Sequence, residues 1–239
     1  MNTFKGPFQL FFEDFRMQMT IIAIITAFIF AVASVIGYVV AVQINHAIFG
    51  PVYGLLFIYP FIAFTKGYKN LMALGGTRKQ FLLSVFINAF LFIAIAMILL
   101  NSLHFLNQYL YVRDLTYLNL IHTGSFLPNE SILLYFWSDF IWAILAFSIG
   151  FIINALWHYF GAIKSLMIAT IFGLGLLTWY MVGGNVASLL TYIVENPLLF
   201  IHILLAIALT FLVISYLLMK NGPLEKGGHT STWGEGITE

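Results

Sequence analysis

The sequence predicts an all-α membrane protein with six transmembrane helices. Hydrophobic residues make up 62% of the 239 residues and charged residues only 8%, whereas a soluble domain carries about 25% charged residues. Six apolar segments are long enough, or nearly long enough, to cross about 30 Å of hydrocarbon as helices. Lys and Arg are concentrated on one side of these crossings, as membrane insertion favours. Lipid must therefore solvate most of the chain.

The predicted spans cover residues 19–42, 47–64, 81–103, 133–157, 165–182 and 197–219. The second span is short and contains Pro60, so a buried re-entrant hairpin is its alternative. Aromatic residues such as Trp137, Trp157 and Trp179 lie at expected span ends, where amphipathic rings favour the membrane interface.

The distribution of cations predicts cytoplasmic N- and C-termini in a multi-pass protein of the cell membrane. Nine of the ten Lys and Arg residues then lie inside: Lys5, Arg16, Lys66, Lys69, Arg78, Lys79, Lys164, Lys220 and Lys226. Arg113 alone lies outside. The same asymmetry supports the second span as a true crossing, because removing that span would change the side of the basic loop.

Residues 1–17 are expected to form a helix in the membrane interface. Aromatic side chains recur there at helical spacing, namely Phe4, Phe8, Phe11, Phe12 and Phe15. Polar and charged residues fall largely on the other face, as in an interfacial helix. The alternative is an irregular start to the first span, which the adjacent acids Glu13 and Asp14 disfavour.

The basic loop at residues 66–80 is expected to contain a helix, a break and the start of another helix. Leu71, Met72 and Leu74 give the short helix an apolar face, and Gly75-Gly76 ends it. Thr77 followed by Gln80 matches a capping box that opens the third span. The alternative function of this loop is a positively charged anchor that only fixes topology.

Three further segments complete the predicted organisation. Residues 104–132 form a small extracellular cap, and residues 186–194 form a short interfacial helix after a Gly183-Gly184-Asn185 break. The tail at residues 220–239 is expected to be flexible. The chain thus divides into residues 1–17, a transmembrane domain at residues 18–219 and a cytoplasmic tail.

Several classes of chemistry are disfavoured by the sequence. It has no Cys, no G-x-x-x-x-G-K-[ST] phosphate loop and no H-E-x-x-H metal motif. No two of its six His residues are three or four positions apart, so no helical metal pair forms. A net charge of +1 argues against a nucleic-acid partner. We therefore expect a non-enzymatic chain that binds no metal or cofactor itself.

A few polar residues inside the predicted spans are candidates for a translocation path. Asp139 and His202 lie at similar depths from the outer ends of their spans, and Asn88 and Asn154 lie deeper. Asp139 and His202 could face an outward vestibule and pair or contact a basic group on an amphipathic peptide. Alternatively, Asp139 is only wetted from outside, and the two Asn residues join helices.

The complete arrangement resembles the membrane permease subunit of type-2 ABC exporters. The local match is the stretch Met72-Ala73-Leu74-Gly75-Gly76-Thr77-Arg78-Lys79-Gln80-Phe81, which is similar to the x-x-L-G-x-[ST]-R-K-x-F pattern that follows the second span in bacterial members. The chain looks most like small stand-alone permeases of Gram-positive bacteria. Some of those export amphipathic peptides, including phenol-soluble modulins.

This resemblance implies that the loop helix is a coupling helix that docks on a separate ATPase subunit. The coupling residues would be Lys69, Leu71, Met72, Leu74, Gly75, Gly76, Arg78 and Lys79. It also implies two ATPase chains, which bind ATP and Mg, and a second permease chain as a homo- or heterodimer. The substrate would be hydrophobic or amphipathic. The alternative is a non-transporting immunity or sensor protein that binds an amphipathic peptide in the bilayer.

Overall fold

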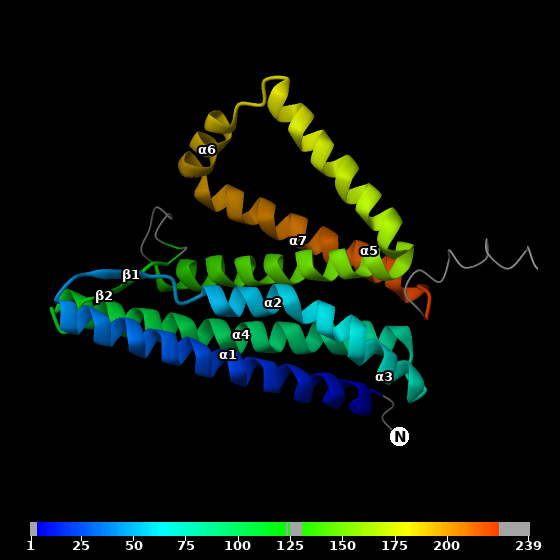
Figure 1. The fold of residues 1–239 in the computed structure, drawn as a ribbon, viewed down its shortest axis with the longest axis horizontal. Helices are drawn as coiled ribbons and strands as arrows, with labels where there is room; N and C mark the ends of the chain where they lie inside the picture. The colour runs from blue at the N-terminus through cyan, green and yellow to red at the C-terminus, as the bar shows by residue number, and fades with distance from the viewer. Residues whose placement is uncertain (1–3, 123, 125–130, 225–239) are drawn as a thin grey trace, which may run out of the picture.

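The computed structural model describes residues 4–122, 124 and 131–224, which form a helical bundle with a small sheet at one end (Figure 1). The elements are α1 (Lys5–Val40), β1 (Ile44–His46), α2 (Gly50–Ile62), the π-helix η1 (Ala63–Gly67), α3 (Tyr68–Ala73), α4 (Arg78–Val112), β2 (Leu118–Leu120), α5 (Ile132–Met181), α6 (Val186–Glu195) and α7 (Pro197–Lys220). We call the end with β1 and β2 the strand end, and the opposite end the α3 end.

Four helices in the described part of the chain are long and apolar enough to cross a membrane, namely α1, α4, α5 and α7. This confirms the prediction of a mainly helical protein with helices long and apolar enough to span a membrane. The second predicted span falls on α2, which has only 13 residues but continues through η1 into α3. The fourth and fifth predicted spans both fall within α5, which has 50 residues.

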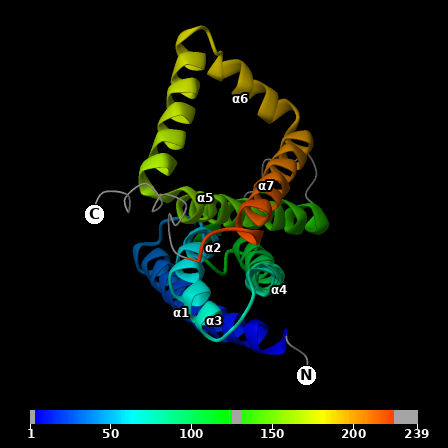
Figure 2. The ribbon, with the colours of Figure 1, turned by 90° about the vertical axis from the view of Figure 1, so that its right-hand side faces the viewer.

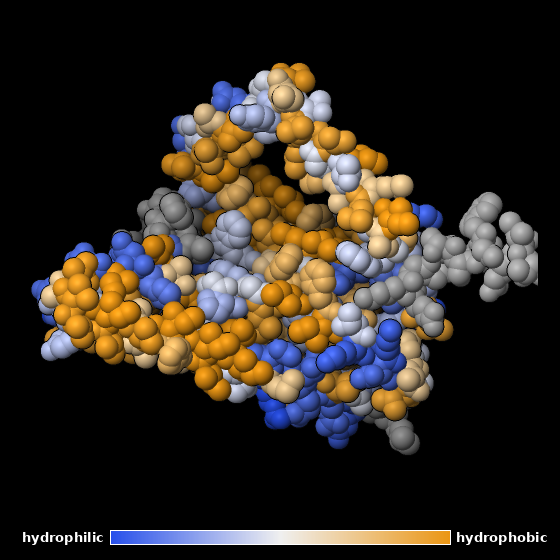
Figure 3. Space-filling model, in the orientation of Figure 1, coloured by the Kyte–Doolittle hydropathy of each residue, from blue (hydrophilic) through white to orange (hydrophobic). Residues whose placement is uncertain are grey.

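α5 changes direction at Gly161, which divides it into two arms. Gly161 has a φ of 78° and a ψ of 174°, a conformation that side chains with a Cβ rarely adopt. Residues 132–160 lie in the bundle, whereas residues 162–181 lead away from it, and α6 and α7 return the chain to it (Figure 2). None of residues 162–195 is buried, and Figure 3 shows an apolar surface on this part of the molecule.

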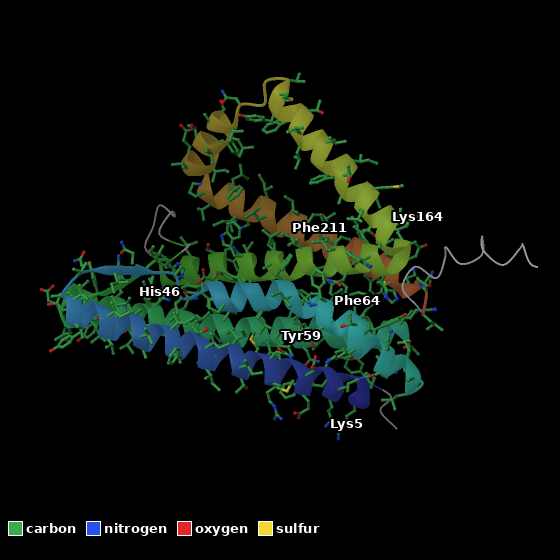
Figure 4. All side chains as sticks on the ribbon, in the orientation of Figure 1. Lys5, His46, Tyr59, Phe64, Lys164 and Phe211 are labelled. Carbon is green, nitrogen blue, oxygen red and sulfur yellow. The ribbon has the colours of Figure 1, made fainter. Side chains whose placement is uncertain are left out.

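The core lies between α1, α2, α4, the bundle arm of α5 and α7, and aromatic rings fill much of it. Tyr59 of α2 and Phe64 of η1 lie in the middle of this bundle (Figure 4). Phe64 contacts Phe81 of α4 and Phe151 of α5 edge-on, with ring centroids 5.2 and 5.0 Å apart. Edge-on contacts suit the charge distribution of aromatic rings, so η1, which continues α2, is held between α4 and α5.

The structure differs from the expectation of a separate interfacial helix at residues 1–17. Over its described part this segment is the beginning of α1, which continues to Val40 without a break. Phe11 and Phe15 are buried in the core, while Phe8 and Phe12 are half-buried. The ring of Phe15 stacks on Phe92 at 4.7 Å. The Phe side chains therefore pack largely against other helices, because α2 and α4 extend alongside the first turns of α1.

The polar face of the same segment is exposed. Lys5, Gln9, Glu13 and Arg16 point away from the core, and Arg16 pairs with Glu13. They coincide with a hydrophilic area on the first part of α1, beside the apolar surface of its second part (Figure 3). Phe4 is half-buried and contacts Phe8, with ring centroids 6.1 Å apart.

Local sequence signals place several helix ends correctly. Gln80 N–H donates to Thr77 Oγ1 at 3.2 Å and Thr77 N–H donates to Gln80 Oε1 at 2.8 Å, which confirms the capping box. Gly75 has a φ of 79°, as expected for a glycine that ends a helix. α6 confirms the helix predicted at residues 186–194, and Asn185 caps it by accepting from Ser188 N–H.

The strand end contains a parallel pairing that the sequence did not predict. β1 and β2 align Ile44 with Leu118 and His46 with Leu120. The expected extracellular cap at residues 104–132 begins as helix, because α4 extends to Val112. Within that cap, residues 123 and 125–130 lie outside the described residues. Most of the tail predicted to be flexible, residues 225–239, also lies outside them.

Candidate functional site

The α3 end carries the segment that was predicted to couple the chain to an ATPase. α3 continues α2 directly through η1, so it is not an independent loop helix. Gly75 N–H donates to Met72 O at 3.0 Å and Gly76 N–H donates to Leu71 O at 2.9 Å. These bonds satisfy carbonyl groups at the end of α3, and the chain then turns sharply into α4.

The predicted apolar tip is reduced to one residue. Leu71 is only 3% exposed and belongs to the chain's own core, and Met72 is half-buried against that core. Leu74 is 79% exposed. The spacing of these residues predicted a shared face, but residues 71 and 72 turn toward the bundle because α3 is packed against it. Leu74 is therefore the apolar residue that a partner could cover.

Basic side chains surround this tip. Lys69 and Lys79 are exposed, and Arg78 is half-buried. A hollow of about 480 Å³ lies beside them, lined by Met72, Gly76, Thr77, Arg78, Lys79, Lys220 and Leu224. Lys164 follows the bend of α5 at Gly161 by three residues and lies at the same end of the molecule (Figure 4). This end thus presents an apolar residue beside cations, which suits a protein surface with acidic groups.

One backbone carbonyl joins α3 to the helices that return to this end. Tyr68 of α3 donates its hydroxyl to Pro223 O at 3.1 Å. His158 Nε2 of α5 lies 3.0 Å from the same oxygen, and the two rings are 4.9 Å apart. Because Pro223 follows α7, this contact links α3, α5 and α7. Sequence reasoning missed it, since no local pattern relates residues so distant in the chain.

The strand end contains a buried polar cluster around Asp139, which we call the Asp139 node: Tyr53, Asn101, His122 and Asp139. Asp139 has an exposed fraction of 0%. Its Oδ2 lies 2.7 Å from His122 Nε2 and 2.8 Å from Asn101 Nδ2, and its Oδ1 accepts from the Tyr53 hydroxyl at 3.2 Å. A buried carboxylate needs such donors in place of water.

The position of His122 is fixed on both sides of its ring. Gly124 N–H donates to Nδ1 at 2.7 Å, so a neutral ring carries its proton on Nε2 and donates it toward Asp139. Phe49 meets the ring edge-on at 4.9 Å, and Tyr135 lies 4.4 Å away. The node therefore joins α2, α4, α5 and the segment after β2.

The expected pairing of Asp139 with His202 is wrong. Asp139 is directed into the bundle and contacts His122, whereas His202 is exposed on α7 and its Nδ1 lies 2.7 Å from Leu198 O. The two residues do lie at similar levels, since Trp137 of α5 is 6.3 Å from the His202 ring. Depth along a helix was predicted, but the face of the helix was not.

Asn88 and Asn154 lie apart from this node. Asn88 Nδ2 donates to Ser84 O at 2.9 Å and to Phe8 O at 3.2 Å, which ties α4 to α1. Asn154 Nδ2 donates to Gly150 O at 2.8 Å within α5. Both are about 20 Å from the node along their helices. The four residues proposed for a translocation path therefore do not form one site within a single chain.

A groove of about 340 Å³ runs between α1 and α4. It is almost entirely apolar, with Arg16 at one end, and is lined by Arg16, Met19, Thr20, Ala23, Thr26, Ala27, Val52, Phe92, Ile95, Ala96, Leu99, Leu100 and Leu103. Such a lining suits acyl chains or apolar side chains. Among the described residues, no group of three or more His, Cys, Asp or Glu could hold a metal ion.

Comparisons with known protein families, with curated proteins and with solved structures find no match to this chain.

Proposed function

We propose that this chain is the permease subunit of an ATP-driven ABC exporter. It forms the translocation path for a hydrophobic or amphipathic substrate, such as a peptide, and a separate subunit hydrolyses ATP. Two ATPase chains and a second permease chain complete the transporter in the cell membrane. The strand end faces the outside and the α3 end faces the cytoplasm.

Six crossings are part of this proposal. α1, α4 and α7 each supply one. The two arms of α5, separated at Gly161, supply two, because each exceeds the 18 or so residues that a short crossing needs. The remaining crossing is α2 with η1, which together extend about 27 Å at 1.5 Å per residue. This arrangement places Lys69, Lys79 and Lys164 on the cytoplasmic side, as the positive-inside rule favours.

The observation that carries the proposal is the exposure of Leu74 among cations at the α3 end. Cations at the end of a spanning bundle mark a region outside the hydrocarbon, so lipid tails do not cover Leu74. A Leu that is 79% exposed to water at the end of α3 suits burial against a partner protein. Its continuity with α2 would carry any movement of that partner into the bundle.

The experiment is a comparison of two Leu→Asp variants at opposite ends. Tagged chains are purified from native membranes, and co-purifying ATPase activity is measured with and without an added cationic amphipathic peptide. Leu74→Asp is expected to lose the ATPase or its stimulation by peptide, because a charge replaces the apolar anchor. Leu115→Asp is the matched control, since Leu115 is 67% exposed at the strand end.

Membrane abundance of both variants must equal that of the parent for this comparison. If Leu74→Asp retains both the ATPase and the stimulation, the coupling assignment is wrong. If the parent chain purifies without any ATPase yet still binds the peptide, the non-transporting immunity or sensor function is supported instead.

A further inference from the structure

The Asp139 node and α3 lie at opposite ends of one continuous helical segment, residues 50–73, which we call the α2 rod. Residues at its internal junctions, Ile62, Ala63, Gly67 and Tyr68, keep right-handed helical dihedrals. The rod extends about 36 Å at 1.5 Å per residue. Tyr53, near one end, contacts Asp139, and Tyr68, near the other, contacts Pro223.

The α2 rod touches the backbone of α5 between these two ends. A Cβ on Gly150 would lie 2.1 Å from Phe57 O, so the two helix backbones are in direct contact there. Phe57 lies between Tyr53 and Tyr68 in the rod. Helices in close backbone contact can tilt about the contact but cannot approach further, so this point has the geometry of a pivot.

At the Tyr53 end, hydrogen bonds to Asp139 hold α2 against α4 and α5. In the described part of the chain, Asp139 contacts Tyr53 of α2, Asn101 of α4 and His122 after β2, and the Tyr53 bond is the longest of these at 3.2 Å. Displacing Tyr53 removes one donor from a carboxylate without access to water. Because a buried carboxylate that lacks one donor is costly, the cluster is expected either to keep all its donors or to open to solvent. This is two-state behaviour.

We infer that the α2 rod is a lever that pivots on Gly150 and that the Asp139 node is the lock it releases at the strand end. A displacement of α3 tilts the rod, withdraws Tyr53 from Asp139 and frees His122. This inference rests on the proposed function for the source of the displacement. The tilt of the α2 rod and the release of Tyr53 involve this chain alone, so they are testable without an ATPase.

The lock is tested with a buried thiol in purified protein in detergent, where both ends are accessible to reagent. The chain has no Cys, and Ser138, next to Asp139, is 1% exposed. Ser138→Cys is expected to react slowly with a maleimide. Adding Tyr53→Phe, which deletes only the hydroxyl, is expected to raise that rate about tenfold, as the loss of one hydrogen bond to a charged group implies. Tyr38→Phe, at an exposed Tyr of α1, is the matched control.

The lever is tested at the far end of the molecule, with the same Tyr53 substitution in a chain that keeps Ser138. Spin labels at Ala73→Cys and Lys164→Cys, both exposed positions, report the separation of α3 from the bend of α5. Tyr53→Phe is expected to shift or broaden this distance distribution, because coupling between two sites is reciprocal. Asp139→Asn, which keeps the side-chain size, is expected to act in the same direction.

Two results would overturn the inference. Unchanged thiol reactivity in both Tyr53→Phe and Asp139→Asn would show that the node does not hold the strand end closed. Raised reactivity with an unchanged distance distribution would show a local contact without a lever. Neither result depends on an ATPase, so neither is confused with failure of the proposed permease function.

Discussion

At the scale of single residues, Asp139 shows how a carboxylate can be kept inside an apolar bundle. Its partners Tyr53, Asn101 and His122 come from three different elements, so each donor position is fixed by a separate packing contact. Gly124 N–H in turn fixes the His122 ring. A carboxylate held in this way specifies how those elements meet, because any other packing leaves a buried charge without donors.

Substitution of Gly150 tests the close contact between α2 and α5. Gly150→Ala is expected to lower the thermal stability of the purified protein, because its Cβ would overlap Phe57 O of α2 and force two helices apart. Overpacking of this kind costs about 1–3 kcal/mol. Gly173→Ala, in the same helix, is the control, since nothing lies within 4 Å of its Cβ, and Ala is favoured over Gly in helices by about 1 kcal/mol.

The two variants should therefore shift the unfolding temperature in detergent in opposite directions, or leave the Gly173 variant unchanged. Equal shifts would mean that α2 and α5 do not meet at Gly150. The pivot proposed for the α2 rod would then lose its basis, whereas the Asp139 node would stand on its own contacts.

At the scale of elements, α1 has two parts with different surroundings. In its first turns the Phe side chains face the core and the charges face outward, whereas exposed apolar residues such as Phe28 and Val35 dominate its second part. The Phe15 ring stacks on Phe92 at 4.7 Å and meets a tilted Tyr59 ring at 4.0 Å, which fixes the first part against α4 and α2. The first turns thus contribute to the core as well as to the surface.

Truncation of Phe15 tests this packing. Phe15→Ala is expected to destabilise the protein by about 3–5 kcal/mol, the usual cost of emptying a buried aromatic site. Phe28→Ala, in the same helix, is expected to cost much less, because Phe28 is 68% exposed. Thermal unfolding in detergent, monitored through the remaining fraction of monodisperse protein, compares the stability of the two variants. Similar losses for the two variants would favour the interfacial helix expected from the sequence.

Elements defined by neighbouring residues were predictable from the sequence, and contacts between distant residues were not. The Thr77–Gln80 cap, the Gly75 helix end and α6 follow from rules that act within one or two turns. The pairing of β1 with β2 and the contact of Tyr53 with Asp139 join residues more than 70 positions apart. Single-sequence patterns carry no information on such pairs.

The same distinction explains which features of the candidate site could be predicted from the sequence. Hydropathy located Asp139 at the correct level of its helix, but periodicity in an almost uniformly apolar helix does not indicate which face is inward. The pairing with His202 was therefore wrong, and His122 fell within the expected extracellular cap at residues 104–132 without being predicted as a partner of Asp139. At the α3 end, spacing gave Leu71, Met72 and Leu74 one face, whereas packing of α3 on the bundle left only Leu74 exposed.

At the scale of the whole molecule, the arm of α5 after Gly161 and the following α6 distinguish this chain from a closed bundle. Residues 162–195 contribute no buried side chain, although most of them are apolar (Figure 3). Apolar helices whose side chains are this exposed require lipid or another chain around them. If both arms of α5 cross the membrane, as we propose, the bend at Gly161 lies at a membrane surface, because a break inside hydrocarbon would expose unsatisfied backbone groups to lipid.

The side on which that bend lies decides the number of crossings. With six spans, Lys69 and Lys164 are cytoplasmic, and Arg113 and Asn185 are outside. Four single-Cys variants at these exposed positions are treated with a membrane-impermeant maleimide on intact cells. Arg113→Cys and Asn185→Cys are expected to react directly, and the two Lys variants only after permeabilisation, because the positive-inside rule retains basic segments in the cytoplasm. Reaction of Lys164→Cys on intact cells would exclude a cytoplasmic bend, and reaction of Lys69→Cys would reverse the side of α3. Reaction at position 164 would leave α5 without two crossings, and reaction at position 69 would separate α3 from any cytoplasmic ATPase. The permease proposal therefore depends on this labelling pattern.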